Sequence, residues 1–254
     1  MTVATDRFDD PAAVADDVAG RPGRLLAAFD VDGVLAPIVS HAADAALLPG
    51  VLDALIALAA LTPVGVVSGR AVENLERFGF PESFLVAGSH GAERRGVPLA
   101  PLSAPERQRL GRLHSLAARA AAEAGSGAWV ETKPTSVVLH VREADAERGD
   151  AALEELARLA ALVSGADVRR GHAVVELATR PATKAAAIGA MRLDLPPGPV
   201  LYVGDDITDE DVFSSLTQID VGVRVGPGAT AATRRLRDPQ DVLMLVRRLV
   251  GLLS

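Results

Sequence analysis

The stretch Leu25–Pro37, LLAAFDVDGVLAP, constrains the possible fold of this chain more than any other. The short apolar run at residues 25–29 predicts a strand buried on both sides, and open α/β sheets bind ligands at the carboxyl ends of such strands. Side chains two residues apart in an extended chain point the same way, so we expect Asp30 and Asp32 to face one pocket. Gly33 permits a sharp turn directly after them. The plainer alternative is a strand end with a solvated Asp-Gly turn.

Short apolar strands alternate with helical patterns at both ends of the chain, which predicts a doubly wound parallel sheet. Between them, the order helix, two strands, helix, two strands predicts a compact α+β unit inserted into the first sheet. We therefore expect an acidic N-terminal arm at residues 1–22, a core made of residues 23–103 and 178–254, and an inserted domain at 104–177. The expected core strands are Leu25–Phe29, Pro63–Val67, Phe84–Ala87, Val200–Val203 and Asp220–Val225.

Composition excludes several kinds of function. The formal net charge is −7 and there is no basic tract, so a nucleic-acid partner is not expected. The chain has no cysteine, which excludes disulfides, zinc thiolates and cysteine nucleophiles. It has neither an apolar leader nor an apolar run long enough to cross a membrane. We expect a cytoplasmic monomer that acts on a small molecule.

Each core strand ends at a polar group, and parallel strands should bring these groups to one edge of the sheet. Asp30, Asp32, Ser68 and Asp205 are placed in this way, and Lys184, one of only two lysines among the 26 basic residues, stands at a helix start. Two carboxylates about 4 Å apart repel by about 4 kcal/mol at an effective dielectric constant of 20, so such a cluster favours a cation. Oxygen ligands alone favour Mg²⁺, and the hydroxyl, the lysine and the turn N–H groups suit a phosphate. This combination indicates phosphoryl transfer through an aspartyl-phosphate.

Four motifs of the chain, DVDGVL, SGR, a lone lysine at a helix start and GDDITDED, occur in the order found in the haloacid dehalogenase (HAD) superfamily and resemble its motifs. GSHGA, WVETKPTSVVLHVRE and VELATRPATKAA resemble the trehalose-6-phosphate phosphatase family more closely. The resemblance covers about residues 24–235. It implies a HAD-like Rossmannoid core with an α+β cap domain of the C2B type, and Mg²⁺-dependent hydrolysis of trehalose 6-phosphate to trehalose and phosphate.

Several alternatives remain open at this point. Another cap-bearing sugar phosphatase, acting on sucrose phosphate or on a mannosyl- or glucosyl-3-phosphoglycerate, has the same core motifs. A phosphotransfer mutase would release an isomer in place of phosphate, and a non-catalytic relative would serve as a sugar-phosphate sensor. GDDITDED could also be only an acid-rich helix N-terminus, which the helix dipole favours.

The resemblance implies a role for each matching residue. Asp30 would attack phosphorus, and Asp32 would protonate the leaving sugar oxygen and then activate water. Ser68 and Lys184 would hold the phosphoryl oxygens. The implied Mg²⁺ ligands are Asp30, the Asp32 backbone carbonyl and Asp205, with either Asp206 or Asp209 acting through water. The implied sugar-binding residues are Glu131, Lys133 and Glu176 of the insert and Arg70 and His90 of the core.

The strand pattern of the insert predicts which of its side chains share a face. Trp129, Glu131 and Lys133 alternate with an apolar position on one strand, and His140 does so on the next. We expect the apolar face to pack on the helices of the insert and the polar face to look onto open space. That space is either bulk water or the substrate site.

Overall fold

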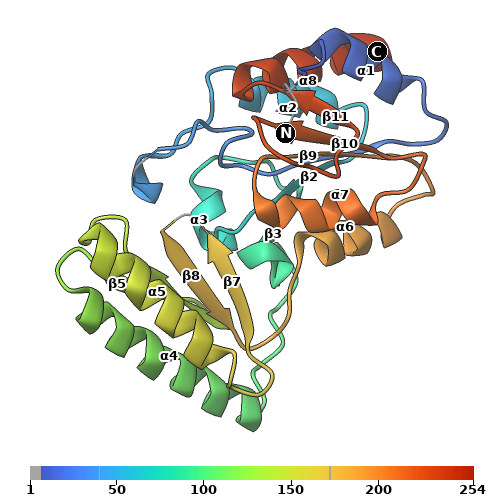
Figure 1. Ribbon diagram of the computed structural model, residues 1–254. Coiled ribbons are helices and arrows are strands. Elements are labelled where there is room, and N and C mark those ends of the chain that lie inside the picture. The colour runs from blue at the N-terminus through green and yellow to red at the C-terminus, as the bar shows by residue number, and fades with distance from the viewer. Residues whose placement is uncertain (1–6, 40, 172) are drawn as a thin grey trace. The chain divides into compact units, whose positions relative to one another are not determined.

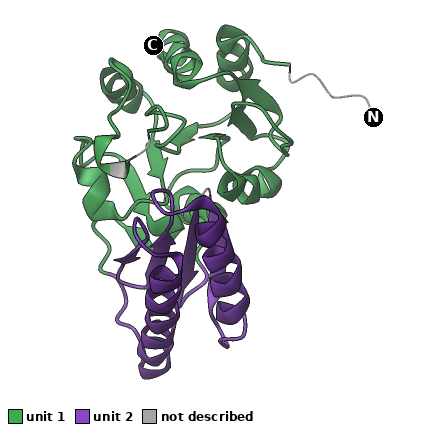
Figure 2. Cartoon of the chain, turned by 60° about the vertical axis from the view of Figure 1, so that its left-hand side comes forward, with its two compact units in different colours: residues 1–98, 182–254 green, residues 99–181 purple. Residues whose placement is uncertain are grey.

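The computed structural model describes residues 7–39, 41–171 and 173–254 (Figure 1). The chain divides into two compact units, Met1–Pro98 with Ala182–Ser254 and Leu99–Pro181 (Figure 2). The predicted insert, residues 104–177, lies within the second unit. No helix in the described part of the chain is both long enough and apolar enough to span a membrane.

The first unit is built on a seven-stranded sheet with the order β11-β10-β9-β1-β2-β3-β4. All neighbouring strands pair in parallel except β3 and β4, which are antiparallel. This arrangement confirms the expected doubly wound parallel sheet. The strands are β1 (Leu26–Phe29), β2 (Val64–Val67), β3 (Leu85–Gly88), β4 (Glu93–Arg94), β9 (Val200–Gly204), β10 (Val221–Val225) and β11 (Arg234–Leu236).

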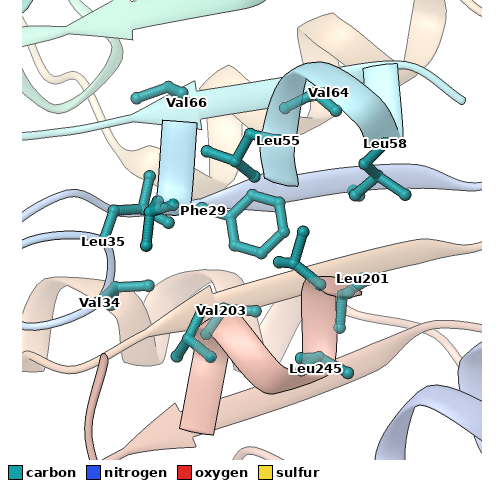
Figure 3. Packing of buried hydrophobic residues seen from close by; sticks show 14 of the residues in the cluster. Phe29, Val34, Leu35, Leu55, Leu58, Val64, Val66, Leu201, Val203 and Leu245 are labelled. Carbon is teal, nitrogen blue, oxygen red and sulfur yellow. The ribbon is translucent and has the colours of Figure 1, made fainter. Parts of the chain in front are cut away.

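Helices cover both faces of this sheet because its central strands are apolar on both sides. On β1, Ala27 and Phe29 point into one core cluster, while Leu26 and Ala28 point into the other. Figure 3 shows Phe29 surrounded by leucine and valine side chains from neighbouring strands and helices. The helices of this unit are α1 (Pro11–Ala19), α2 (Val51–Ala59), α3 (Val72–Glu76), α6 (Lys184–Leu193), α7 (Glu210–Ser215) and α8 (Pro239–Leu253), with 3₁₀ turns η1 (Ala42–Asp44), η2 (Ser89–Gly91) and η3 (Ile207–Asp209).

The N-terminal segment expected at residues 1–22 contains α1. Residues 1–6 lie outside the described part of the chain. Asp10 caps this helix by accepting a hydrogen bond from the Ala12 N–H. Val14, Ala15 and Val18 are buried in the same core cluster as residues of α8, and α1 packs along α8 (Figure 1). The described part of this segment is therefore a layer of the first unit.

The second unit is an antiparallel four-stranded sheet, order β5-β6-β8-β7, with two helices. Val137, Leu139, Val175 and Leu177 alternate along β6 and β8 and pack with both helices in one core cluster. The residues between them, such as Val138 and Glu176, point to the other face of the sheet and do not belong to that cluster. The elements are α4 (Ala104–Ala124), β5 (Trp129–Thr132), β6 (Ser136–His140), α5 (Ala146–Ala160), β7 (Asp167–Gly171) and β8 (Val174–Ala178).

Candidate active site

Three carboxylates converge at the carboxyl ends of β1 and β9. These strands pair in parallel, with Phe29 opposite Val203, so Asp30 and Asp205 follow them at the same edge. Asp209, at the end of η3, completes a cluster in which one carboxylate oxygen of each residue lies within 4.8 Å of the others. Asp30 and Asp209 are buried and Asp205 is partly exposed.

Lys184 inserts its ammonium group into this cluster from the first turn of α6. Thr183 caps the helix by accepting a hydrogen bond from the Ala186 N–H, which fixes where the helix starts and where the lysine points. Lys184 Nζ lies 2.6 Å from Asp30 Oδ2 and 2.8 Å from Asp209 Oδ1. Burial disfavours the charge of Lys184, but the two carboxylates outweigh it and raise the pKa of this lysine.

Both carboxylate oxygens of Asp209 accept hydrogen bonds within the chain. Its Oδ1 accepts from Lys184 and, at 2.6 Å, from the Tyr202 hydroxyl, and its Oδ2 accepts the Asp205 and Asp206 N–H groups at 2.9 Å each. Burial opposes ionisation, but Lys184 and these hydrogen bonds outweigh it and lower the pKa of Asp209. A Cβ atom on Gly204 would overlap the carboxyl group of Asp209, so the close approach requires glycine there. Asp209 therefore holds the turn that presents Asp205.

Tyr202 is a member of the site that the sequence reasoning missed. It is the only tyrosine of the chain, it is fully buried on β9, and its ring packs edge-on against Phe213 with centroids 5.7 Å apart. A buried tyrosine hydroxyl almost always has a hydrogen-bond partner. That rule, applied to a lone tyrosine two residues before the GDD motif, is the signal that could have identified it.

Burial and neighbouring carboxylates disfavour the charged forms of Asp30 and Asp205. Burial raises the pKa of Asp30 to about 7, against the opposing effect of Lys184. Burial, together with the charges of Asp30 and Asp209, raises the pKa of Asp205 to about 8. Asp30 is buried and Asp205 is partly exposed, and the raised pKa of each shows that its charged form is disfavoured, so together they form an oxygen donor set that suits a hard divalent cation. The residues present thus fit the expected Mg²⁺, with Asp30 and Asp205 as the donors.

The turn after β1 requires glycine at position 33. Gly33 has a φ angle of 75°, and a Cβ atom there would overlap Asp205 Oδ2. The backbone of this turn is largely satisfied within the chain, because the Val31 N–H donates to Asp30 Oδ1 and the Gly33 N–H to the Ala36 carbonyl. The sequence assigned the N–H groups of this turn to a phosphate, and in the structure those of Val31 and Gly33 are bonded within the chain.

Asp32 is held by Arg70 and is not part of the carboxylate cluster. Arg70 donates from Nε to Asp32 Oδ2 at 2.7 Å and from Nη2 to Asp32 Oδ1 at 2.8 Å, a two-pronged ion pair. The guanidinium lies 5.6 Å from the centroid of the Phe78 ring. The sequence reasoning placed Arg70 at the sugar, whereas the structure places it on the carboxylate expected to transfer protons.

Ser68 and His90 lie at the ends of the next two strands. Ser68 follows β2, is buried, and accepts the Arg70 N–H on its Oγ at 3.2 Å, so its own hydroxyl proton can point elsewhere. The His90 N–H donates to the Ser68 carbonyl at 2.9 Å, which brings the histidine to the same edge. Asp206 is exposed and caps η3 through the Ile207 N–H, and it does not join the carboxylate cluster.

The sugar-binding candidates of the second unit form two pairs on the polar face of its sheet. Lys133 Nζ lies 3.3 Å from Glu176 Oε1, which also accepts the Ser136 hydroxyl at 2.6 Å. The Lys133 and Glu176 side chains are each 8% exposed. This pair therefore does not face bulk water, which was one of the two expectations for the polar face of the sheet. Glu131 forms the second pair, with His140 at 3.0 Å.

Comparison with known proteins finds similarity to trehalose phosphatases in both sequence and fold. Residues 28–240 match the family model described as trehalose-phosphatase. The chain is 32% identical over 225 residues to a trehalose-6-phosphate phosphatase of Escherichia coli, covering 84% of this chain and 82% of that protein. It is 34% identical to an uncharacterized glycosyl hydrolase of Mycobacterium tuberculosis, covering 89% of this chain but only 18% of that longer protein. The fold is similar to that of the C-terminal domain of a Candida albicans trehalose-6-phosphate phosphatase, with a TM-score of 0.83, 22% identity and coverage of 98% and 99% of the two chains.

Proposed function

The chain belongs to the trehalose-phosphatase family, and from this premise we propose that it is a Mg²⁺-dependent phosphatase that hydrolyses trehalose 6-phosphate to trehalose and phosphate. One observation carries the proposal beyond family membership. A buried lysine and three carboxylates meet at the ends of two parallel strands, beside a serine hydroxyl at the end of the next strand. This set combines a nucleophile, a cation site and phosphate donors.

Asp30 is the proposed nucleophile. Its carboxylate attacks phosphorus, and the bond from phosphorus to the sugar oxygen breaks as the aspartyl-phosphate forms. Lys184, whose Nζ lies 2.6 Å from the Asp30 carboxylate, would hold a phosphoryl oxygen, and the buried Ser68 hydroxyl would donate to another. Bound Mg²⁺ would neutralise charge on the phosphoryl group as it is transferred.

Asp32 is the proposed acid and base. In its acid form it gives a proton to the departing sugar oxygen, and as a carboxylate it then removes a proton from the water that attacks phosphorus and restores Asp30. Arg70 holds both Asp32 oxygens in the structure, and we propose that this pair opens before the proton moves. Opening would also make the Arg70 guanidinium available to the substrate, as the sequence reasoning proposed.

The resemblance implies most of the metal ligands, and the existing hydrogen bonds decide between Asp206 and Asp209 for the one that acts through water. Asp30 and Asp205, with the Asp32 backbone carbonyl, would hold the ion. Asp209 accepts four hydrogen bonds within the chain, so we propose Asp206 as the residue that acts through water. We further propose that Glu131, Lys133, Glu176 and His90 bind sugar hydroxyls, and that the enzyme is a cytoplasmic monomer.

Phosphate release from a panel of sugar phosphates tests the function. Purified protein should hydrolyse trehalose 6-phosphate faster than sucrose 6-phosphate or a mannosyl-3-phosphoglycerate, and removal of Mg²⁺ by a chelator should abolish turnover. Faster turnover of either competitor would overturn the substrate assignment. Formation of an isomeric sugar phosphate without free phosphate would instead identify a mutase.

A further inference from the structure

The first residue of β5 is an exposed aromatic that the proposed chemistry does not use. Trp129 is the only tryptophan of the chain, and 51% of its surface is exposed. Its indole stacks on the His140 imidazole with ring centroids 4.0 Å apart and an angle of 6° between the planes. The stack fixes the orientation of the indole without covering its exposed surface.

His140 is itself held from the side. His140 Nε2 lies 3.0 Å from Glu131 Oε2, and this hydrogen bond lowers the pKa of Glu131, which stays ionised at neutral pH. Trp129 and Glu131 are two residues apart on β5, and Trp129 lies opposite His140 in the antiparallel pairing. The three side chains form one cluster, in which the indole stacks on the imidazole and the imidazole contacts the carboxylate.

The cluster of Trp129, Glu131 and His140 lies on the same sheet face as the Lys133–Glu176 pair. In the strand register, Glu131 lies opposite Val138, which lies opposite Glu176. The alternating side chains of β6 and β8 pack on the helices and leave this face polar. From Trp129, the first residue of β5, to Lys133, the residue after its end, an extended chain covers about 13 Å, which is more than one hexose ring spans.

We propose that the exposed indole of Trp129, backed by His140, stacks on a sugar ring of the substrate and selects a disaccharide phosphate over a monosaccharide phosphate. A pyranose ring presents an apolar face of C–H groups and a rim of hydroxyls, which match an aromatic ring with a carboxylate at its edge. The Lys133–Glu176 pair then serves the hydroxyls at the other end of the strand. The inference rests on the proposed function, and it adds a residue and a contact that the phosphate chemistry does not require.

Fluorescence tests the contact directly, because all tryptophan emission of the protein comes from Trp129. Trehalose titrated into the wild type, and trehalose 6-phosphate titrated into the Asp30→Asn variant, should each change the emission to a saturating value. The midpoint should agree with the dissociation constant from calorimetry. Calorimetric binding without any change in emission would overturn the proposal. Emission that depends on protein concentration and not on sugar would assign Trp129 to a contact between copies, and would overturn it equally.

Kinetics test the consequence for the substrate. Trp129→Ala should raise KM for trehalose 6-phosphate about fivefold and leave kcat within a factor of two, because a stacking contact is worth about 1 kcal/mol. Trp129→Phe, which keeps an aromatic ring, should have a KM close to that of the wild type. Neither variant should change the hydrolysis of p-nitrophenyl phosphate, which lacks a sugar. Leu162→Ala is the matched control, because Leu162 is 75% exposed in the same unit and lies off this sheet face.

The outcomes separate this inference from the proposed function. If the wild type fails to hydrolyse trehalose 6-phosphate, the proposed function is wrong, and the same variants are compared on whichever sugar phosphate the wild type does hydrolyse. A raised KM for that compound in Trp129→Ala supports the stacking role. An unchanged KM in Trp129→Ala, on either substrate, overturns it.

Discussion

At the scale of single residues, the site depends on groups whose hydrogen-bond capacity is already filled. The carboxylate of Asp209 accepts bonds from Lys184, Tyr202 and two backbone N–H groups, so it organises the cluster without an open position of its own. The sequence places acidic side chains at 205, 206 and 209. Which of them join the carboxylate cluster depends on which ones the turn directs inward. That choice follows from three-dimensional distances and from no local pattern.

Tyr202→Phe tests the importance of this buried network. The change keeps the ring that packs on Phe213 and removes one donor to a buried carboxylate. We expect the free energy of unfolding in urea to fall by about 2 kcal/mol. Ser215→Ala is the control, since it also removes one hydroxyl, that of an exposed serine bonded to the Val212 carbonyl, and should change stability by about 0.5 kcal/mol or less. Equal stability of the two variants would contradict the account.

Asp220 gives a prediction about pH away from the site. Burial opposes its ionisation, but hydrogen bonds from Thr217, Arg192 and the Val200 N–H outweigh burial and lower the pKa of Asp220. Because the folded-state pKa lies below that of the unfolded chain, Asp220 stabilises the fold above the unfolded-state pKa of about 3.9. This stabilisation is lost as the pH falls through the folded-state value.

Asp220→Asn should therefore lower the free energy of unfolding by about 2–3 kcal/mol at pH 7. The difference from wild type should begin to shrink below about pH 4, because the carboxylate of the unfolded chain takes up a proton there while the folded one stays ionised. Urea unfolding of both proteins at pH 7, 5 and 3.5 measures it. A difference that stays constant over this range would show that the charge of Asp220 does not stabilise the fold.

At the scale of elements, the apolar central strands were predictable and the edge strands were not. Leu26–Phe29 and Val200–Gly204 are continuous apolar runs, which the sequence shows directly. β11, with the sequence RRL, is a strand only because β10 offers it a pairing edge, and two arginines hide it from any hydrophobic pattern. The sequence describes residues 1–22 only as an acidic arm, because the acidic residues of α1 mask an apolar stripe that packs on α8.

The turn after β1 can be tested with two matched glycine variants. Gly33 and Gly96 both have a φ angle of 75°, so alanine costs similar backbone strain at either position. Only at Gly33 would the new methyl group overlap Asp205, whereas nothing lies within 4 Å of a Cβ atom at Gly96.

Gly33→Ala should lose phosphatase activity by about 100-fold, because displacing a carboxylate by about 1 Å is enough for such a loss. Gly96→Ala should keep activity within about twofold of wild type and show a similar fall in melting temperature. Steady-state rates and thermal unfolding of the two variants, measured side by side, decide the question. Comparable activity in both would mean that the Gly33 turn does not set the position of Asp205.

At the scale of the whole molecule, the chain folds as two units with separate cores, and it crosses between them near residues 98 and 181. Much of the candidate site could be predicted from sequence, because the strand ends are easy to locate and lysine is rare. The structure brings Asp30, Asp205 and Lys184 together. The pairing of Asp32 with Arg70 could not be predicted, because residues 38 positions apart meet only through the order of the strands. The sugar-binding roles remain predictions.

The central claim is that Asp30 carries the phosphoryl group of trehalose 6-phosphate. Phosphate release by Asp30→Asn, compared with wild type and with the control Asp53→Asn on the exposed side of α2, tests it most directly. The account predicts a loss of about 10⁴-fold or more in kcat for Asp30→Asn, with substrate binding retained, and wild-type turnover for Asp53→Asn. Turnover by Asp30→Asn within about tenfold of wild type would contradict the mechanism.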